Sequence, residues 1–134
     1  EKEFADKIAV SLGQKQADLA TAKNIQPYKT ESRAFGSTDV GDVSFAVPTV
    51  GMGAATWVPG TPAHSWQAVA AGGTTIGKKG MMVAAKTLTL TAIELFQNKD
   101  LVEKAKTEFI ERRGADFKYI PLLGDRAPAL DYRE

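Results

Sequence analysis

The feature that most constrains the fold is a broad apolar stripe in the second half of the chain. Its residues recur at spacings of three and four, which is the repeat of one helix face: Met81, Met82, Ala85, Leu88, Ala92, Leu95 and Phe96. We therefore expect one long helix here. A chain of 134 residues buries only a modest core.

Shorter helices are predicted on either side of this stripe. Apolar residues recur at helical spacing over residues 4–12, and Gly13 follows as a helix stop. A further helix is expected from Asp100, a predicted N-cap, to Arg113, with Gly114 ending it. The sequence thus predicts helices near the beginning of the chain and again after the long helix.

Between these helices, two stretches have the pattern of strands. Apolar side chains alternate from Val43 to Val47, and Pro48 ends the run. Residues 50–58 form a second extended stretch of mainly small residues, against which another element is expected to pack closely. Two strands alone are marginal in water. We therefore predict an α/β fold, with helices packed on strands of a mixed sheet whose other strands lie outside this chain.

Composition excludes several classes of protein. The net charge is +1, so no global field attracts nucleic acid or an anionic membrane. There is no cysteine, which excludes disulfides and thiolate metal sites and fits a cytoplasmic protein. No apolar run reaches the roughly 20 residues that span a bilayer. The basic residues lie near acids without interleaved aromatic residues, which predicts a solvated surface: Lys78, Lys79, Lys86, Arg112, Arg113 and Arg126.

The one histidine of the chain, His64, lies in a loop that contains Pro59 and Pro62. Proline stiffens such a loop and lowers the entropy lost on binding, and a neutral imidazole suits zinc or general-base catalysis. The alternative is an ordinary surface histidine. The residues alone leave both interpretations open.

A second candidate segment, residues 37–44, places Asp39 and Asp42 three positions apart before the first predicted strand. Such a segment can orient a metal-bound histidine or bind substrate, or it can be a simple turn. A catalytic triad of Ser37, His64 and Asp39 is conceivable, but Ser37 lacks the glycine pattern of a nucleophile elbow.

The third candidate segment, residues 72–79, nearly matches the phosphate-binding loop of nucleotide-binding proteins. Residues 66–71 would be the preceding strand. However, Lys79 stands where a hydroxyl would hold magnesium. A glycine-rich helix start is the alternative to nucleotide binding.

Taken together, residues 37–44, 60–67 and 77–81, in this order and spacing, resemble the C-terminal part of amidohydrolases of the aminoacylase and glutamate carboxypeptidase family of dinuclear-zinc metallopeptidases. The resemblance runs from about residue 35 to residue 96. It implies that residues 1–134 are one segment of a zinc-aminopeptidase-like catalytic domain, incomplete without the N-terminal half, with 115–134 an irregular tail.

The resemblance also implies a reaction and roles for particular residues. The complete enzyme would use two divalent ions, zinc or manganese, to cleave the amide bond of N-acyl or N-aroyl amino acids such as p-aminobenzoyl-glutamate. His64 would be a metal ligand. The remaining candidates would bind substrate or support the ligands: Ser37, Thr38, Asp39, Asp42, Gly60 and Thr61.

The sequence departs from the family in lacking a His-x-Asp pair and the Glu-Glu pair whose first member is the general base. This chain is therefore predicted to be inactive alone, to supply no catalytic residue and not to hold the metals. Its expected partners are the rest of the catalytic domain and a lid domain, and the isolated chain is expected to self-associate. A nonenzymatic binding or scaffold module is the alternative.

Overall fold

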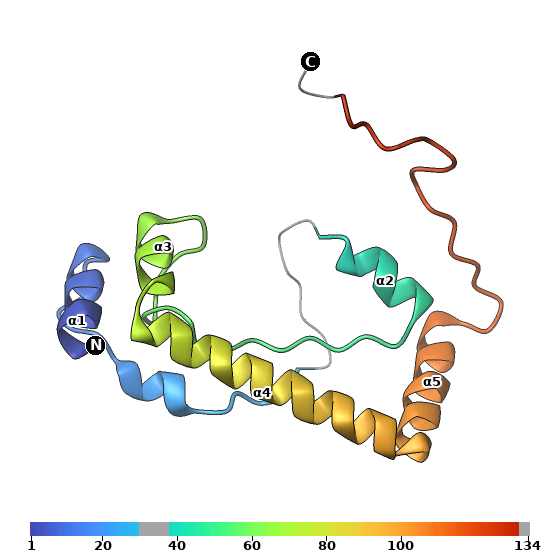
Figure 1. The fold of residues 1–134 in the computed structure, drawn as a ribbon, viewed down its shortest axis with the longest axis horizontal. Coiled ribbons are helices and arrows are strands. Elements are labelled where there is room, and N and C mark those ends of the chain that lie inside the picture. Colours follow the sequence, from blue (N-terminus) through green and yellow to red (C-terminus); the bar gives the residue numbers. More distant parts are fainter. Residues whose placement is uncertain (30–37, 132–134) are drawn as a thin grey trace. The chain divides into compact units, whose positions relative to one another are not determined.

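The computed structural model describes residues 1–29 and 38–131 (Figure 1). Within these ranges the chain forms five α-helices and one 3₁₀ helix, and no β-strand. The predicted α/β class, with helices packed on a mixed sheet, is therefore wrong for this chain. The chain divides into two compact units, one of Glu1–Arg33 and Gly51–Gln97, the other of Ala34–Val50 and Asn98–Glu134.

The first unit contains α1 (Lys2–Ser11), the 3₁₀ helix η1 (Leu19–Lys23), α3 (Trp66–Gly72) and α4 (Thr75–Gln97). The long helix predicted from the apolar stripe is confirmed as α4. The first helix is confirmed as well, and Gly13 follows it with a φ of 77°, a left-handed conformation that favours glycine.

A small apolar core holds this unit together. Ala5 and Ile8 of α1 are buried against Val58, which is 1% exposed. Partly buried apolar side chains surround these three: Phe4, Leu12, Ala17, Leu19 and Ile76. The spacing of three and four along α1 explains this burial, because it places these residues on one face. Val58 is thereby fixed at the point where the His64 loop begins.

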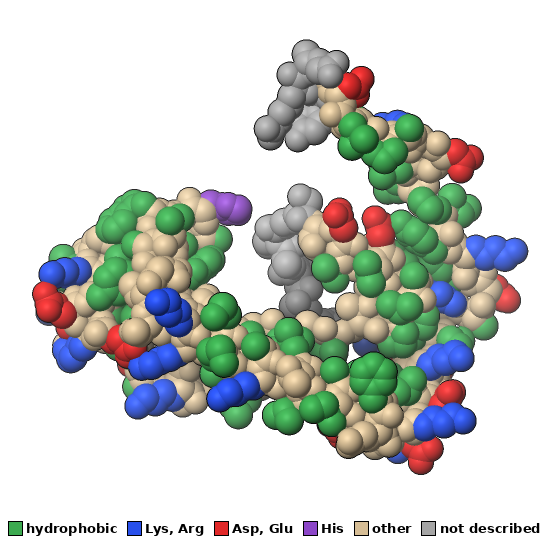
Figure 2. Space-filling view, in the orientation of Figure 1, with side chains coloured by type: hydrophobic (Ala, Val, Ile, Leu, Met, Phe, Trp, Pro, Cys, Tyr) green, Lys and Arg blue, Asp and Glu red, His purple; other side chains and the backbone are tan. Residues whose placement is uncertain are grey.

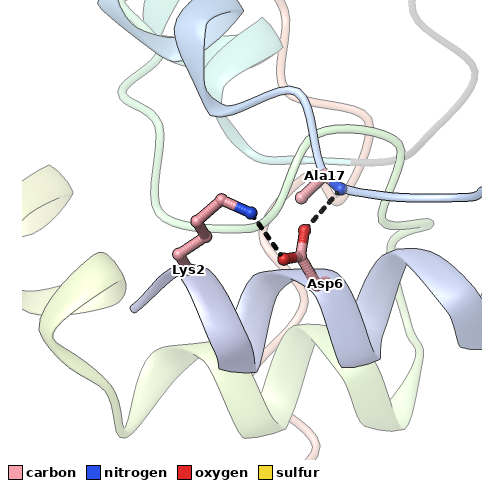
Figure 3. Close-up of polar contacts among 3 residues, drawn as sticks. All are labelled: Lys2, Asp6 and Ala17. Atoms are coloured by element: carbon pink, nitrogen blue, oxygen red, sulfur yellow. Dashed lines mark hydrogen bonds and ion pairs between the residues drawn. The ribbon is translucent and has the colours of Figure 1, made fainter.

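A polar contact fixes the segment after α1 (Figure 3). The carboxylate of Asp6 accepts a hydrogen bond from the Ala17 amide at 3.0 Å and pairs with Lys2 at 3.0 Å. The bond from Ala17, followed by the ammonium of Lys2, holds the pKa of Asp6 below its usual value. This hydrogen bond holds the segment that follows α1 against α1.

Two glycines of α4 allow close backbone approach in the same unit. A Cβ at Gly77 would lie 2.8 Å from the carbonyl oxygen of Ala71 in α3, and one at Gly80 would lie 2.8 Å from Cγ2 of Thr56. Helices α3 and α4 are in contact. Another element was expected to pack closely on the stretch 50–58, and α4 does so at Ala55 and Thr56, but the stretch is not a strand.

The second unit contains α2 (Val40–Ala46) and α5 (Lys99–Arg113). The strand predicted over 43–47 is wrong, since most of it lies in α2. Val40, Val43 and Val47 are also spaced by three and four, so this short run fits both periods. The stretch 50–58 is not paired to any strand in the described residues, and without a partner its backbone cannot form a ladder.

The N-cap of helix α5 lies two positions earlier than predicted. Its N-cap is Asn98, whose side chain accepts a hydrogen bond from the Leu101 amide at 3.1 Å, and not Asp100. Gly114 ends it as predicted, with a φ of 92°. Residues 115–131 contain turns and no helix or strand.

The apolar face of α4 is largely uncovered. Leu88 and Phe96 are exposed, Phe96 to 92%. None of the described helices is long and apolar enough to cross a membrane. The exposure of this face leaves it open to contact with other protein.

Candidate functional site

The loop between Val58 and α3 presents His64 at the surface of the first unit (Figure 2). His64 has a φ of 57°, which is the left-handed region that residues other than glycine seldom adopt. Such a conformation costs on the order of 1–3 kcal/mol and persists only where neighbouring structure fixes it. The backbone at His64 is thus held in a defined conformation by the surrounding loop.

Ser65 provides much of this support. Its hydroxyl donates to the Pro62 carbonyl at 2.7 Å and accepts from the Ala68 amide at 3.2 Å, which makes it the N-cap of α3. Gln67, two positions on, is buried and donates to the Ser11 hydroxyl at 3.4 Å. His64 therefore lies between a buried valine and a capped helix, and both ends of the loop are anchored.

Gly60 and Thr61 lie in the same loop as His64. Gly60 has a φ of 87°, and a Cβ there would come within 2.6 Å of the Gln14 side chain. The amide of Thr61 donates to the Val58 carbonyl at 3.1 Å, so in this conformation the amide is not available to bind a substrate. The Thr61 hydroxyl is buried and has no hydrogen-bond partner in the described part of the chain. Their predicted contact with substrate stays a prediction.

The acidic turn, which we define as Thr38, Asp39 and Asp42, forms the start of α2 in the second unit. The Thr38 hydroxyl accepts from the Val40 amide at 3.4 Å, and the Asp39 carbonyl accepts from the Asp42 amide at 3.1 Å. Asp39 occupies the N-cap, but its side chain makes no capping bond. The carboxylate of Asp39 is exposed to solvent and does not cap the helix. Ser37 lies outside the described residues.

The sequence-based predictions missed the aromatic residues that pack against Phe45 of α2. The ring of Phe45 stacks on Phe117 at 5.4 Å and on Tyr119 at 6.1 Å between centroids. A hydrogen bond to Asp42 raises the pKa of Tyr119, with burial adding to the shift. The sequence did contain a signal for this cluster, because three aromatic residues lie within about ten positions around the end of α5: Phe109, Phe117 and Tyr119.

Arg113 was predicted to lie on a solvated surface, and this is wrong. Its guanidinium lies 4.5 Å from the ring centroid of Phe109 and 5.7 Å from that of Phe117. It also donates to the Phe45 carbonyl at 3.0 Å. Arg112 by contrast is exposed and pairs with Glu108 on its own helix. The prediction that no aromatic residues accompany the basic residues was therefore wrong for Arg113.

The candidate residues do not make a metal site by themselves. Over residues 1–29 and 38–131 there is no group of three histidine, cysteine or carboxylate side chains that could hold an ion. One imidazole does not provide the ligand number on which tight binding depends. Any metal role for His64 therefore requires ligands beyond those that the described residues bring together.

A shallow cavity of about 520 Å³ lies along α4, and none of these candidates lines it. Its lining comes from one helix: Thr75, Lys78, Lys79, Met82, Val83 and Lys86. No histidine or carboxylate lines it. The strand predicted before the phosphate-loop-like segment is wrong, because α3 is there, and Lys78 lies within α4. The strand–loop–helix setting that a phosphate loop needs is therefore not present in this segment.

Comparison with known proteins gives one informative similarity. The chain is 38% identical over 92 residues to one of the subunits of p-aminobenzoyl-glutamate hydrolase from Escherichia coli (strain K12). The match covers 68% of this chain but 19% of that relative, so the chain spans about a fifth of its relative's length. A stretch covering two thirds of the chain includes its middle, where His64 lies. No family model matches the chain, and no solved structure does.

Proposed function

This chain belongs to the amidohydrolase family of p-aminobenzoyl-glutamate hydrolase, and from this membership we propose that it forms part of an enzyme hydrolysing amide bonds of N-acyl or N-aroyl amino acids. The observation that carries the proposal is the 38% identity over 92 residues. p-Aminobenzoyl-glutamate is the proposed substrate, because the relative's name specifies it.

We propose that His64 provides one metal ligand in that enzyme. Two observations support this role: the backbone holds His64 at a φ of 57°, and anchors fix both ends of its loop. A fixed ligand loses little entropy when it binds. Two divalent ions, zinc or manganese, would polarise the amide carbonyl when bound. The other ligands and the general base would come from protein outside this chain.

The acidic turn has a separate proposed role in binding substrate or supporting ligands. Asp39 supports this because its carboxylate is exposed and makes no capping bond. Asp42 lies three positions further on, which places the two carboxylates on neighbouring positions of one helical turn. Ser37, Gly60 and Thr61 are proposed to contribute to substrate binding as well, through their hydroxyl or backbone groups.

The uncovered apolar face of α4 is proposed to pack against other parts of the hydrolase. About four-fifths of the relative's length has no counterpart in this chain, so that relative contains further protein that could cover Leu88 and Phe96. Burying each such side chain stabilises the folded assembly by about 1.5–3 kcal/mol. A lid domain is a further proposed part of that assembly.

The proposal is tested by substituting His64→Ala in the hydrolase that carries this segment. Metal content and hydrolysis of p-aminobenzoyl-glutamate are measured together. Hydrolysis should fall by about 100-fold or more, since even residues that only support a ligand contribute about 10- to 100-fold. Bound metal per molecule should fall as well, while circular dichroism stays unchanged.

Val69→Ala is a matched control, because Val69 is exposed on the neighbouring α3 and should leave metal and activity unaltered. Full metal content and activity in His64→Ala would refute the ligand role. An unsubstituted protein that neither hydrolyses amides nor binds metal, but forms a stable complex with another protein, would instead favour the scaffold alternative.

A further inference from the structure

Helix α2 is too short to be stable through its own hydrogen bonds. It has seven residues, and isolated helices shorter than about 12–15 residues are marginal in water. None of its residues is buried, so no core packing explains its position. Its last carbonyl groups also lack partners within the helix. Contacts from elsewhere in the second unit must therefore hold it.

Arg113 supplies the principal contact of this kind. Its Nη1 donates at 3.0 Å to the carbonyl oxygen of Phe45, 68 positions away in sequence and in the last turn of α2. A cation near the C-terminus of a helix also interacts favourably with the helix dipole. The guanidinium is itself held by the rings of Phe109 and Phe117. Arg113 thus joins the end of α5 to the end of α2.

The rings of the second unit hold the same helix from its side. Phe45 projects from α2 and stacks on Phe117 and Tyr119, with interplanar angles of 23° and 9°. The neighbouring carboxylate of Asp42 raises the pKa of Tyr119. The helix is held near its C-terminal end, by the stacked ring of Phe45 and by the bond to the Phe45 carbonyl.

We propose that Arg113, with Tyr119, is a positioning residue that fixes α2 and thereby the acidic turn in the orientation in which its carboxylates meet substrate or metal ligands. This inference rests on the proposed function for its last step only. Arg113 is not itself a catalytic residue, because it acts through the backbone of Phe45.

The structural step is tested on this chain by hydrogen exchange. Arg113→Ala should reduce the protection of the Val43 and Val47 amides by about fivefold or more, which is the effect of losing one ordinary hydrogen bond. Arg113→Lys should recover part of it, because lysine can donate to the Phe45 carbonyl but cannot stack as arginine does. Arg112→Ala is the control and should change nothing, since Arg112 is exposed and bonds only Glu108 among the described residues.

The functional step is tested in the hydrolase that carries this segment. Tyr119→Phe retains the ring stack but removes the hydroxyl from Asp42. It should raise KM by about threefold to tenfold with little change in kcat, the pattern of an interaction that binds ground state and transition state alike. A purely structural tyrosine would leave KM unchanged, because the stacking remains.

The outcomes separate the two proposals. Unchanged protection of α2 in Arg113→Ala overturns the inference, whatever the activity. Reduced protection together with an unchanged KM in Tyr119→Phe overturns the functional step and leaves the hydrolase proposal standing. If the unsubstituted protein hydrolyses no amide, the proposed function fails, and with it the functional step, while exchange still decides whether Arg113 holds the helix.

Discussion

Gly80 of α4 lies directly against the carbonyl group of Ala55, so closely that a Cβ at position 80 would overlap the Ala55 carbonyl. Thr56 lies against the same point. The backbone of the extended segment therefore crosses α4 where the helix has no side chain. This crossing leads to Val58, the buried residue at which the loop of His64 starts.

Gly80→Ala should destabilise the first unit by about 1–3 kcal/mol, the usual cost of inserting a methyl group into a packed site that cannot yield. The obstacle is backbone, which cannot turn aside as a flexible side chain does. Thermal unfolding followed by circular dichroism measures the change. Gly41→Ala is the control, because a Cβ there meets nothing within 4 Å and alanine favours helix. Equal midpoints for wild type and Gly80→Ala would contradict the close packing.

His64→Gly should leave the fold as stable as the wild type or more stable by about 1 kcal/mol, because glycine adopts a positive φ without steric cost. His64→Val should lower stability, since a β-branched residue tolerates that conformation least. Chemical denaturation of the three proteins gives this order. A valine variant as stable as the glycine variant would show that the loop relaxes and does not hold His64 in place. The glycine variant also removes the imidazole without disturbing the loop.

Asp6 should make the first unit sensitive to acid. Its folded pKa is lowered by the Ala17 amide and then by Lys2, so its contribution to stability is complete above the unfolded value of about 3.9. That contribution is lost as pH falls from there through the lowered folded pKa. Asp6→Asn should reduce the loss of stability as pH falls below that unfolded value, measured as unfolding midpoint against pH. Asp18→Asn is the control, and equal acid sensitivity of Asp6→Asn and wild type would contradict the assignment.

The isolated chain should self-associate through the exposed face of α4. Phe96 is 92% exposed and Leu88 60% exposed, and water leaves such side chains when two faces meet. Phe96→Glu combined with Leu88→Lys should shift sedimentation velocity toward the monomer at a given concentration. Ile25→Glu, at a still more exposed position outside α4, should not. A wild-type chain that remains monomeric up to high concentration would rule out this surface as a contact.

How far the sequence predicts this protein depends on the range of the interactions involved. The 3.6-residue repeat determined α1 and α4, and glycine at positions 13 and 114 determined where two helices end, because these are local properties of the chain. The motifs also led to the right family. The same reasoning failed at 43–47, where a short apolar run fits both helix and strand and only a partner could decide.

What the tertiary structure decided was which distant groups meet. Alternation and small residues predicted two strands, but strands need partners, and in the second stretch Ala55 and Thr56 instead pack against Gly80 of α4. Arg113 was predicted to be a surface charge, but the fold places its guanidinium against the Phe45 carbonyl. Local patterns fix helices because their hydrogen bonds join residues four apart, whereas contacts across 68 positions depend on how the whole chain packs.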